Sequence, residues 1–318
     1  FQFIYAWEYG HRMLGRCVGV AFCVPWLYFS LRKRIPPGFQ PRMVGLVTMG
    51  ASQGLVGWWM VKSGLGNDRR EDTNQIRVKP VRLATHLTLA FATYGALLWT
   101  GLDVLGLPQT TSKLKEVAQS LPKSALPKLN RLRLGSVAMT GCTLITVVSG
   151  AMVAGNDAGR AFNTFPKMGD DWIPQDVFDT YARSLPWYRT ISEDTATVQF
   201  HHRILGMTTA AAGLALMGFG TGGACRAFLT PQARRGLYAV GITSFGQMSL
   251  GVITLLNYVP ISLAALHQLG SVVVFTSGIY LVHALRYARP ALLARTASAA
   301  GAAKAPTAVV SSAKVILK

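Results

Sequence analysis

Four histidines lie inside long apolar stretches, at positions that repeat between the two halves of the chain. His11 and His202 each open the pattern His-Arg-x-Leu-Gly, and a Glu or Gln stands three residues before each of them. His86 follows His11 by 75 residues, and His267 follows His202 by 65. Polar side chains in lipid need partners, and four histidines placed by a repeat favour metal or cofactor ligation over simple hydrogen bonding between helices.

The residues between the paired histidines repeat as well. Gln53 precedes Gly57 by four residues, and Gln247 precedes Gly251 by the same spacing. Two neutral imidazoles from neighbouring helices can fill both axial positions of a haem iron. The pattern therefore predicts two haem sites, one in each half of the chain.

A carboxylate distinguishes the two halves. Glu8 stands three residues before His11, whereas Gln199 stands at the same offset before His202. A carboxylate can move a proton or stabilise developing positive charge, and a carboxamide cannot do so in the same way. We therefore assign chemistry to the half with Glu8 and a resident electron-transfer cofactor to the half with Gln199. The alternative is that Glu8 only pairs with Arg12, one helical turn further on.

Arginines follow the first histidine of each half. Arg12 and Arg203 need a partner inside the membrane, and a haem propionate would supply one through charge-assisted hydrogen bonds. The alternative is that both side chains extend to the headgroups. His201 points about 100° away from His202 around a helix, and His283 lies at the inner end of the last apolar stretch, so we interpret both as supporting residues rather than ligands.

Seven apolar stretches are long enough to hold these residues in a bilayer. Only 14% of the residues are charged, against about 25% in soluble domains, and a membrane helix needs about 20 apolar residues. Frequent small residues favour close helix packing over a β-barrel. The sequence thus predicts an all-α polytopic membrane bundle with spans at about 3–30, 43–61, 83–102, 134–155, 199–220, 237–257 and 261–284.

The formal net charge of +19 is distributed unequally between alternate loops. One set of loops and the C-terminal tail carry 19 basic and 2 acidic residues, and the other set carries 10 of each. By the positive-inside rule the basic side faces the cytoplasm or the mitochondrial matrix. The charge is therefore a topology signal rather than a sign of nucleic-acid binding, and the four intramembrane histidines fall in the outer third of their helices.

Four segments resemble haem A synthase of the mitochondrial and α-proteobacterial type: residues 8–12, 53–65, 163–169 and 200–206. The resemblance extends over about residues 1–285. It implies eight helices in two pseudo-symmetric halves, so one further helix would precede the first stretch. It also implies an oxidoreductase that converts the C8 methyl of haem O into the formyl of haem A, through hydroxylated intermediates, for insertion into cytochrome oxidase.

The resemblance also implies a role for each candidate residue. His11 and His86 match the ligands of the substrate haem, His202 and His267 match the ligands of a bound haem b, and Glu8 matches the catalytic carboxylate. The outer loops contain no cysteine, so the cysteine pair of some bacterial members cannot be carried over. Electrons would instead reach haem b from a protein donor of the ferredoxin type.

The same resemblance sets the expected location and partners. The location is the mitochondrial inner membrane, or the plasma membrane of an α-proteobacterium. Besides the lipid bilayer, haem O and haem A, the expected partners are haem O synthase, other cytochrome oxidase assembly proteins and a second copy of the chain.

The repeat and the resemblance together divide the chain into three parts. Residues 1–133 would form the half-bundle with the substrate-haem site, and residues 134–289 would form the half-bundle with the haem b site. The outer loop 156–198, rich in aromatic residues, is expected to be an ordered cap or binding surface, and the basic tail 290–318 is expected to be disordered.

Two other functions remain open from the sequence. A di-haem electron-transfer cytochrome would keep the four ligands but make Glu8 structural. An inverted-repeat transporter would also contain two similar halves. The transporter is disfavoured because the repeat carries histidine pairs rather than a broken helix at the membrane midplane.

Overall fold

The computed structural model describes residues 2–65, 77–107, 110–182 and 186–288. This part of the chain is almost entirely helical and contains no strand, which confirms the predicted fold class. Seven helices are long and apolar enough to cross a membrane. They are α1 (Gln2–Leu31), α2 (Gln40–Lys62), α3 (Pro80–Val104), α5 (Leu126–Gly155), α8 (Thr195–Thr221), α10 (Pro231–Leu256) and α11 (Ile261–Ala284).

Several helices begin earlier than the apolar pattern predicts, α5, α8 and α10 by at least four residues, because local signals start them in polar sequence. α5 begins at Leu126 rather than near 134, with a proline in its first turn, a position where the missing N–H costs nothing. α8 begins at Thr195 rather than 199, because the Asp194 side chain accepts a hydrogen bond from the Thr197 backbone N–H.

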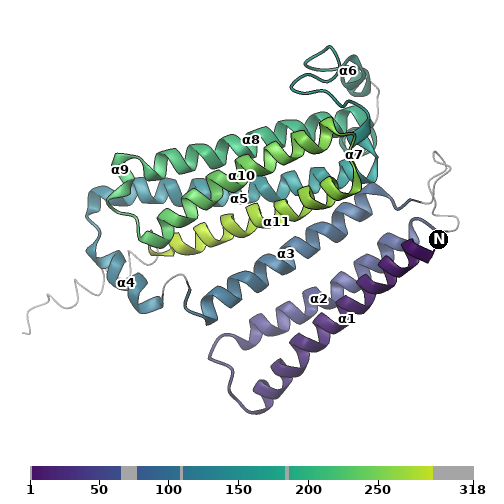
Figure 1. The fold of residues 1–318 in the computed structure, drawn as a ribbon. Helices are drawn as coiled ribbons and strands as arrows, with labels where there is room; N and C mark the ends of the chain where they lie inside the picture. Colours follow the sequence, from purple (N-terminus) through teal and green to yellow (C-terminus); the bar gives the residue numbers. More distant parts are fainter. Residues whose placement is uncertain (1, 66–76, 108–109, 183–185, 289–318) are drawn as a thin grey trace, which may run out of the picture.

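The short elements gather at the two ends of the bundle (Figure 1). One end carries α4 (Thr111–Ser120) and α9 (Gly223–Arg226), and the other carries α6 (Gln175–Ala182) and α7 (Trp187–Glu193). The N-terminus lies at the end that carries α6 and α7. This is the arrangement that the charge pattern predicts, with α6 and α7 on the outer side. The predicted tail 290–318 lies outside the described residues.

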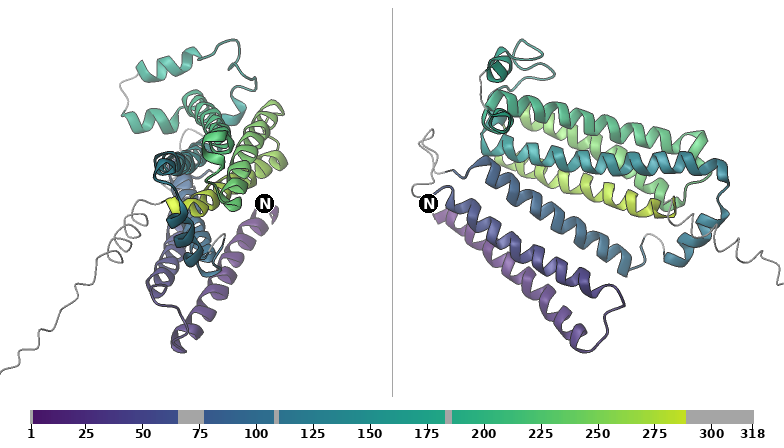
Figure 2. Two further views of the ribbon diagram at one scale, coloured as in Figure 1. Left: turned by 90° about the vertical axis from the view of Figure 1, so that its left-hand side faces the viewer. Right: turned by 180° about the vertical axis from the view of Figure 1, so that it is seen from behind.

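Four helices, α5, α8, α10 and α11, form a closely packed bundle, and α3 packs against α5 and α11. α2 packs on α3, and α1 packs on α2 at the edge, so that α1 and α2 form a hairpin (Figure 2). The inner half of the bundle holds the main apolar cluster, which includes Leu129, Leu132, Leu237 and Leu281. Apolar packing of this kind fixes the position of α11, the helix that carries His267.

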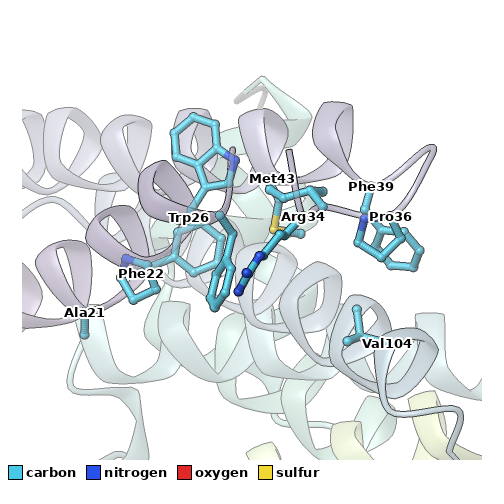
Figure 3. Close-up of a pocket in the computed structure, with 11 residues that line it drawn as sticks. Ala21, Phe22, Trp26, Arg34, Pro36, Phe39, Met43 and Val104 are labelled. Carbon is cyan, nitrogen blue, oxygen red and sulfur yellow. The ribbon is translucent and has the colours of Figure 1, made fainter. Parts of the chain in front are cut away.

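A cavity of about 410 Å³ lies between the inner ends of α1, α2 and α3 (Figure 3). Phe22 and Trp26 line it from α1, Met43 from α2 and Val104 from α3, and the Arg34 side chain extends into it. α1 is therefore separated from α3 at this end and contacts the bundle mainly through α2.

The contact between α3 and α11 joins the two halves of the repeat. Phe91 and Phe275 pack edge to face, with ring centroids 5.4 Å apart. One turn further in, the Tyr94 hydroxyl lies 2.7 Å from the Thr276 hydroxyl. These contacts set the relative height of the two helices that carry His86 and His267.

A partly buried carboxylate, with 13% of its side-chain surface exposed, lies at the inner end of the same contact. Asp103 on α3 accepts hydrogen bonds from Arg42 on α2 at 2.7 Å and from Arg286 just after α11. The buried His283 places Nε2 3.0 Å from the same carboxylate and packs edge to face on Trp99. Removing one partner of a buried ion pair leaves an uncompensated charge, which is strongly destabilising.

We expect Asp103→Asn to lower the free energy of unfolding by about 3 kcal/mol, because two guanidinium groups lose their shared counter-charge. Thermal unfolding of the detergent-solubilised protein measures this loss. Glu116→Gln, an exposed acid-to-amide change on the same side of the membrane, is the matched control. Equal unfolding temperatures for the two variants would show that the cluster does not hold α3 to α11.

Candidate functional site

His202 on α8 and His267 on α11 face each other in the outer half of the bundle. Their ring centroids lie 6.4 Å apart and their planes are nearly perpendicular, at 89°. With metal–nitrogen distances of about 2 Å on each side, two imidazoles that share one metal have centroids about 6 Å apart. The observed separation therefore fits axial ligation of one iron by both rings.

Glycines on the two remaining helices make room for these rings. A Cβ added at Gly150 on α5 would lie 3.1 Å from Cε1 of His202. A Cβ added at Gly251 on α10 would lie only 2.8 Å from Cε1 of His267. Each imidazole thus occupies the space that a side chain on the neighbouring helix would need.

Hydrogen bonds orient both histidines. The Ser149 hydroxyl lies 2.8 Å from Nδ1 of His202, and Nε2 of Gln247 donates to the backbone carbonyl of His267 at 2.7 Å. Nδ1 of His267 and Oε1 of Gln247 are buried without a protein hydrogen-bond partner among the described residues. Unsatisfied buried polar atoms in a native structure indicate a bound water, ion or ligand.

The donor set fits a haem better than a bare metal ion. Within the described part of the chain, no group of three or more His, Cys, Asp or Glu side chains is arranged to hold a metal. A haem iron needs only two protein ligands, because the porphyrin supplies the other four nitrogens. The pair of His202 and His267 meets this requirement.

The N-terminal half repeats the same contacts around His86. A Cβ added at Gly57 on α2 would lie 2.9 Å from Cε1 of His86 on α3. Nε2 of Gln53 donates to the backbone carbonyl of His86 at 3.2 Å. The repeat seen in the sequence is therefore also a repeat of contacts, between α2 and α3 as between α10 and α11.

The other residues predicted for this half lie on α1. His11 lies on α1 with an exposed side chain, and His86 lies on α3. Glu8 Oε2 lies 3.8 Å from the guanidinium of Arg12, and both side chains are more than half exposed. Glu8 thus makes the helical ion pair that the alternative interpretation expected.

Arg203 and Gln199 hold the outer loop, a role that the sequence analysis missed. The guanidinium of Arg203 donates to the backbone carbonyls of Phe162 and Thr164 at 2.8 and 2.9 Å. Gln199 is buried, and its Nε2 donates to the Ala158 carbonyl at 2.7 Å. Because the partners lie about 40 residues away in the chain, local spacing carried no signal of these contacts.

The described part of the outer loop contains two short helices and contacts α8. α6 and α7 lie within it, and the hydroxyl of Tyr181 on α6 lies 2.8 Å from Nε2 of His201. This contact agrees with the supporting role predicted for His201. The Asp103 cluster gives the same role to His283 at the inner end.

Ser149 and Gly150 are the two further residues of the site that the sequence analysis missed. The small residues of α5 predicted close packing but no contact with a histidine. A signal was present only in the Ser-Gly pair at 149–150, and such pairs are too common in membrane helices to identify a site.

Together, the seven spans and the facing histidines define a multi-pass helical membrane protein with a histidine pair inside its bundle. A model of the COX15-CtaA family, described as cytochrome oxidase assembly protein, matches residues 1–279. The chain therefore belongs to this family of cytochrome oxidase assembly proteins.

Curated relatives agree with this assignment. The chain is 44% identical over 296 residues to heme A synthase COX15 of Arabidopsis thaliana, covering 92% of this chain and 60% of the relative. It is 41% identical over 287 residues to heme A synthase COX15 of Homo sapiens, covering 90% of this chain and 65% of the relative. The chain thus spans less than two thirds of the length of these relatives. No solved structure matches it.

We expect Gly251→Ala to impair haem binding, because the added Cβ would lie 2.8 Å from His267 and must displace the ring. Such overpacking costs about 2 kcal/mol, and the haem absorbance per protein should fall by more than half. Gly246→Ala on the same helix is the control, since a Cβ there meets nothing within 4 Å. Equal haem content in both variants would contradict the proposed packing of His267.

Proposed function

We propose that this protein is a haem A synthase, which oxidises the C8 methyl of haem O to a formyl group and so makes haem A for cytochrome c oxidase. The observation that carries the proposal is the repeated histidine site, with His202 and His267 in one half and His11 and His86 in the other. The matched relatives that are named heme A synthase support the same activity.

In this proposal the half formed by residues 134–289 holds a resident haem b between His202 and His267. When bound, haem b supplies a centre that accepts and donates single electrons. The protein holds the two rings apart at a fixed distance, with Gly150 and Gly251 providing the space. Arg203 places a positive charge beside this site, and a haem propionate is the matching anion.

The half formed by residues 1–133 binds haem O as substrate, with His11 and His86 as its ligands. Glu8 lies on the same face of α1 as His11, three residues earlier. A carboxylate in that position can take up a proton from the methyl group as it is oxidised, or stabilise positive charge there. Arg12 is more than half exposed, so its guanidinium is free to turn from Glu8 to a propionate of the substrate.

An electron donor of the ferredoxin type supplies electrons in the proposed system, and the oxidation of the methyl group to a formyl group also requires an oxidant from outside the chain. One relative, from Schizosaccharomyces pombe, is a heme A synthase-mitochondrial ferredoxin fusion protein, 37% identical over 297 residues. We place the protein in the mitochondrial inner membrane, with its basic side toward the matrix. Haem O synthase and other assembly proteins are further partners in this proposal.

One observation favours a second candidate, a di-haem electron-transfer cytochrome. Glu8 pairs with Arg12, as expected if the carboxylate only stabilises α1. Such a protein would bind two haem b groups and leave both unchanged.

We expect His11→Ala and His202→Ala to lose different haems. His11→Ala should keep haem B but lose haem O, its hydroxylated form and haem A, because it removes a substrate ligand. His202→Ala should lose haem B. Haem extraction followed by chromatography measures each species. Two equivalents of haem B in the unaltered protein, with no haem O or haem A, would favour the cytochrome instead.

Glu8→Gln tests the role of the carboxylate. We expect haem A yield to fall by at least 100-fold while haem B content stays unchanged, because acid–base groups contribute about 10²–10⁴ to rate. Glu193→Gln is a matched control, since Glu193 forms an ion pair with Arg189 at the same helical spacing and similar exposure. An unchanged haem A yield in Glu8→Gln would mean that Glu8 is structural.

A further inference from the structure

The hydroxyl of Ser149 makes two polar contacts but has only one proton to donate. Its Oγ lies 2.8 Å from the backbone carbonyl of Thr146 and 2.8 Å from Nδ1 of His202. A carbonyl oxygen can only accept a hydrogen bond. Both contacts form together only if the hydroxyl donates to the carbonyl and accepts from Nδ1–H of His202.

This proton count selects one tautomer of His202. In neutral imidazole one nitrogen carries the proton and the other carries a free lone pair. With the proton on Nδ1, the lone pair of Nε2 is free to bind a metal.

A cluster of small polar side chains keeps Ser149 in this position. The hydroxyls of Thr146 on α5 and Thr209 on α8 lie 2.8 Å apart, and Cys142 Sγ lies 3.3 Å from the Thr209 hydroxyl. The Thr146 hydroxyl also donates to the Cys142 carbonyl at 2.8 Å. These bonds hold α5 and α8 in register, so that the Ser149 hydroxyl stays opposite His202.

The other two histidines have different surroundings. Nδ1 of His86 and Nδ1 of His267 are buried without a hydrogen bond to any described protein group. Nε2 of His86 lies 3.4 Å from Nε2 of the Gln53 amide, which can only donate. Among these three rings, only His202 has a hydrogen-bond partner at Nδ1 in the described part of the chain.

We propose that Ser149 is a positioning residue for the haem b site: its hydroxyl holds His202 in the tautomer with Nε2 free and strengthens Nε2 as an electron donor to the iron. Accepting a hydrogen bond from the second nitrogen raises the basicity of a ligating histidine. A more basic ligand stabilises ferric over ferrous iron, so Ser149 lowers the midpoint potential of the site. This inference rests on the proposed binding of haem b by His202.

The test compares Ser149→Ala with the unaltered protein, purified in detergent with its bound haem. Haem b retention after extended washing and the midpoint potential from a spectroelectrochemical titration are the two readouts. We expect about 10- to 100-fold weaker haem binding and a more positive potential. Ser149→Thr, which keeps the hydroxyl, should restore both values.

Matched variants separate this effect from packing. Ser136→Ala changes another buried serine of α5, whose hydroxyl also donates to a backbone carbonyl but contacts no histidine, and it should leave the potential unchanged. Ser149→Cys keeps the shape but weakens the acceptor, so a smaller positive shift is expected. Ser149→Cys takes the place of Ser149→Ala as the test variant if Ser149→Ala does not fold.

Two outcomes would overturn the inference. If Ser149→Ala loses haem but the remaining haem keeps its potential, Ser149 is a packing residue, and the haem b proposal is unaffected. If His202→Ala retains haem b with an unchanged spectrum, the ligand assignment itself is wrong, and the role of Ser149 is overturned along with it.

Discussion

Three imidazole rings in the outer half of the bundle occupy space that a side chain on a neighbouring helix would fill. Gly57, Gly150 and Gly251 provide this space, each with less than 3.2 Å between a virtual Cβ and the ring. The glycines bring the backbones of adjacent helices close together, which in lipid is itself a source of packing energy. The same residues therefore serve both the stability of the bundle and the geometry of the site.

The second constraint is that polar groups within a membrane must be satisfied by the protein. The Gln53 amide bonds the carbonyl of His86, and the Gln247 amide bonds the carbonyl of His267. Both bonds tie the histidine-bearing helix to its neighbour through the histidine backbone, and the Gln53 amide also lies 3.4 Å from Nε2 of His86. The backbone positions of both histidines are thereby fixed.

Charged residues follow the same rule at the two ends of the bundle. At the inner end, Asp103 gathers cationic groups from two other segments and joins the halves of the repeat. At the outer end, Arg203 binds backbone carbonyls of the loop that follows α5. The histidine pair thus lies between two polar anchors, one holding the helices together and the other holding the outer loop over α8.

The sequence by itself determined the seven spans and the repeat that contains the histidines, because hydropathy and spacing are local properties of the chain. It also paired Gln53 with Gly57 and Gln247 with Gly251, since both members lie on one helix. Only the tertiary structure decided which atoms meet across helices. Three sets of contacts join residues 36 to 183 positions apart: the hydrogen bond between His202 and Ser149, the carbonyl contacts of Arg203 and the bond from Arg286 to Asp103. Such contacts depend on helix rotation and register, which composition and periodicity leave undetermined.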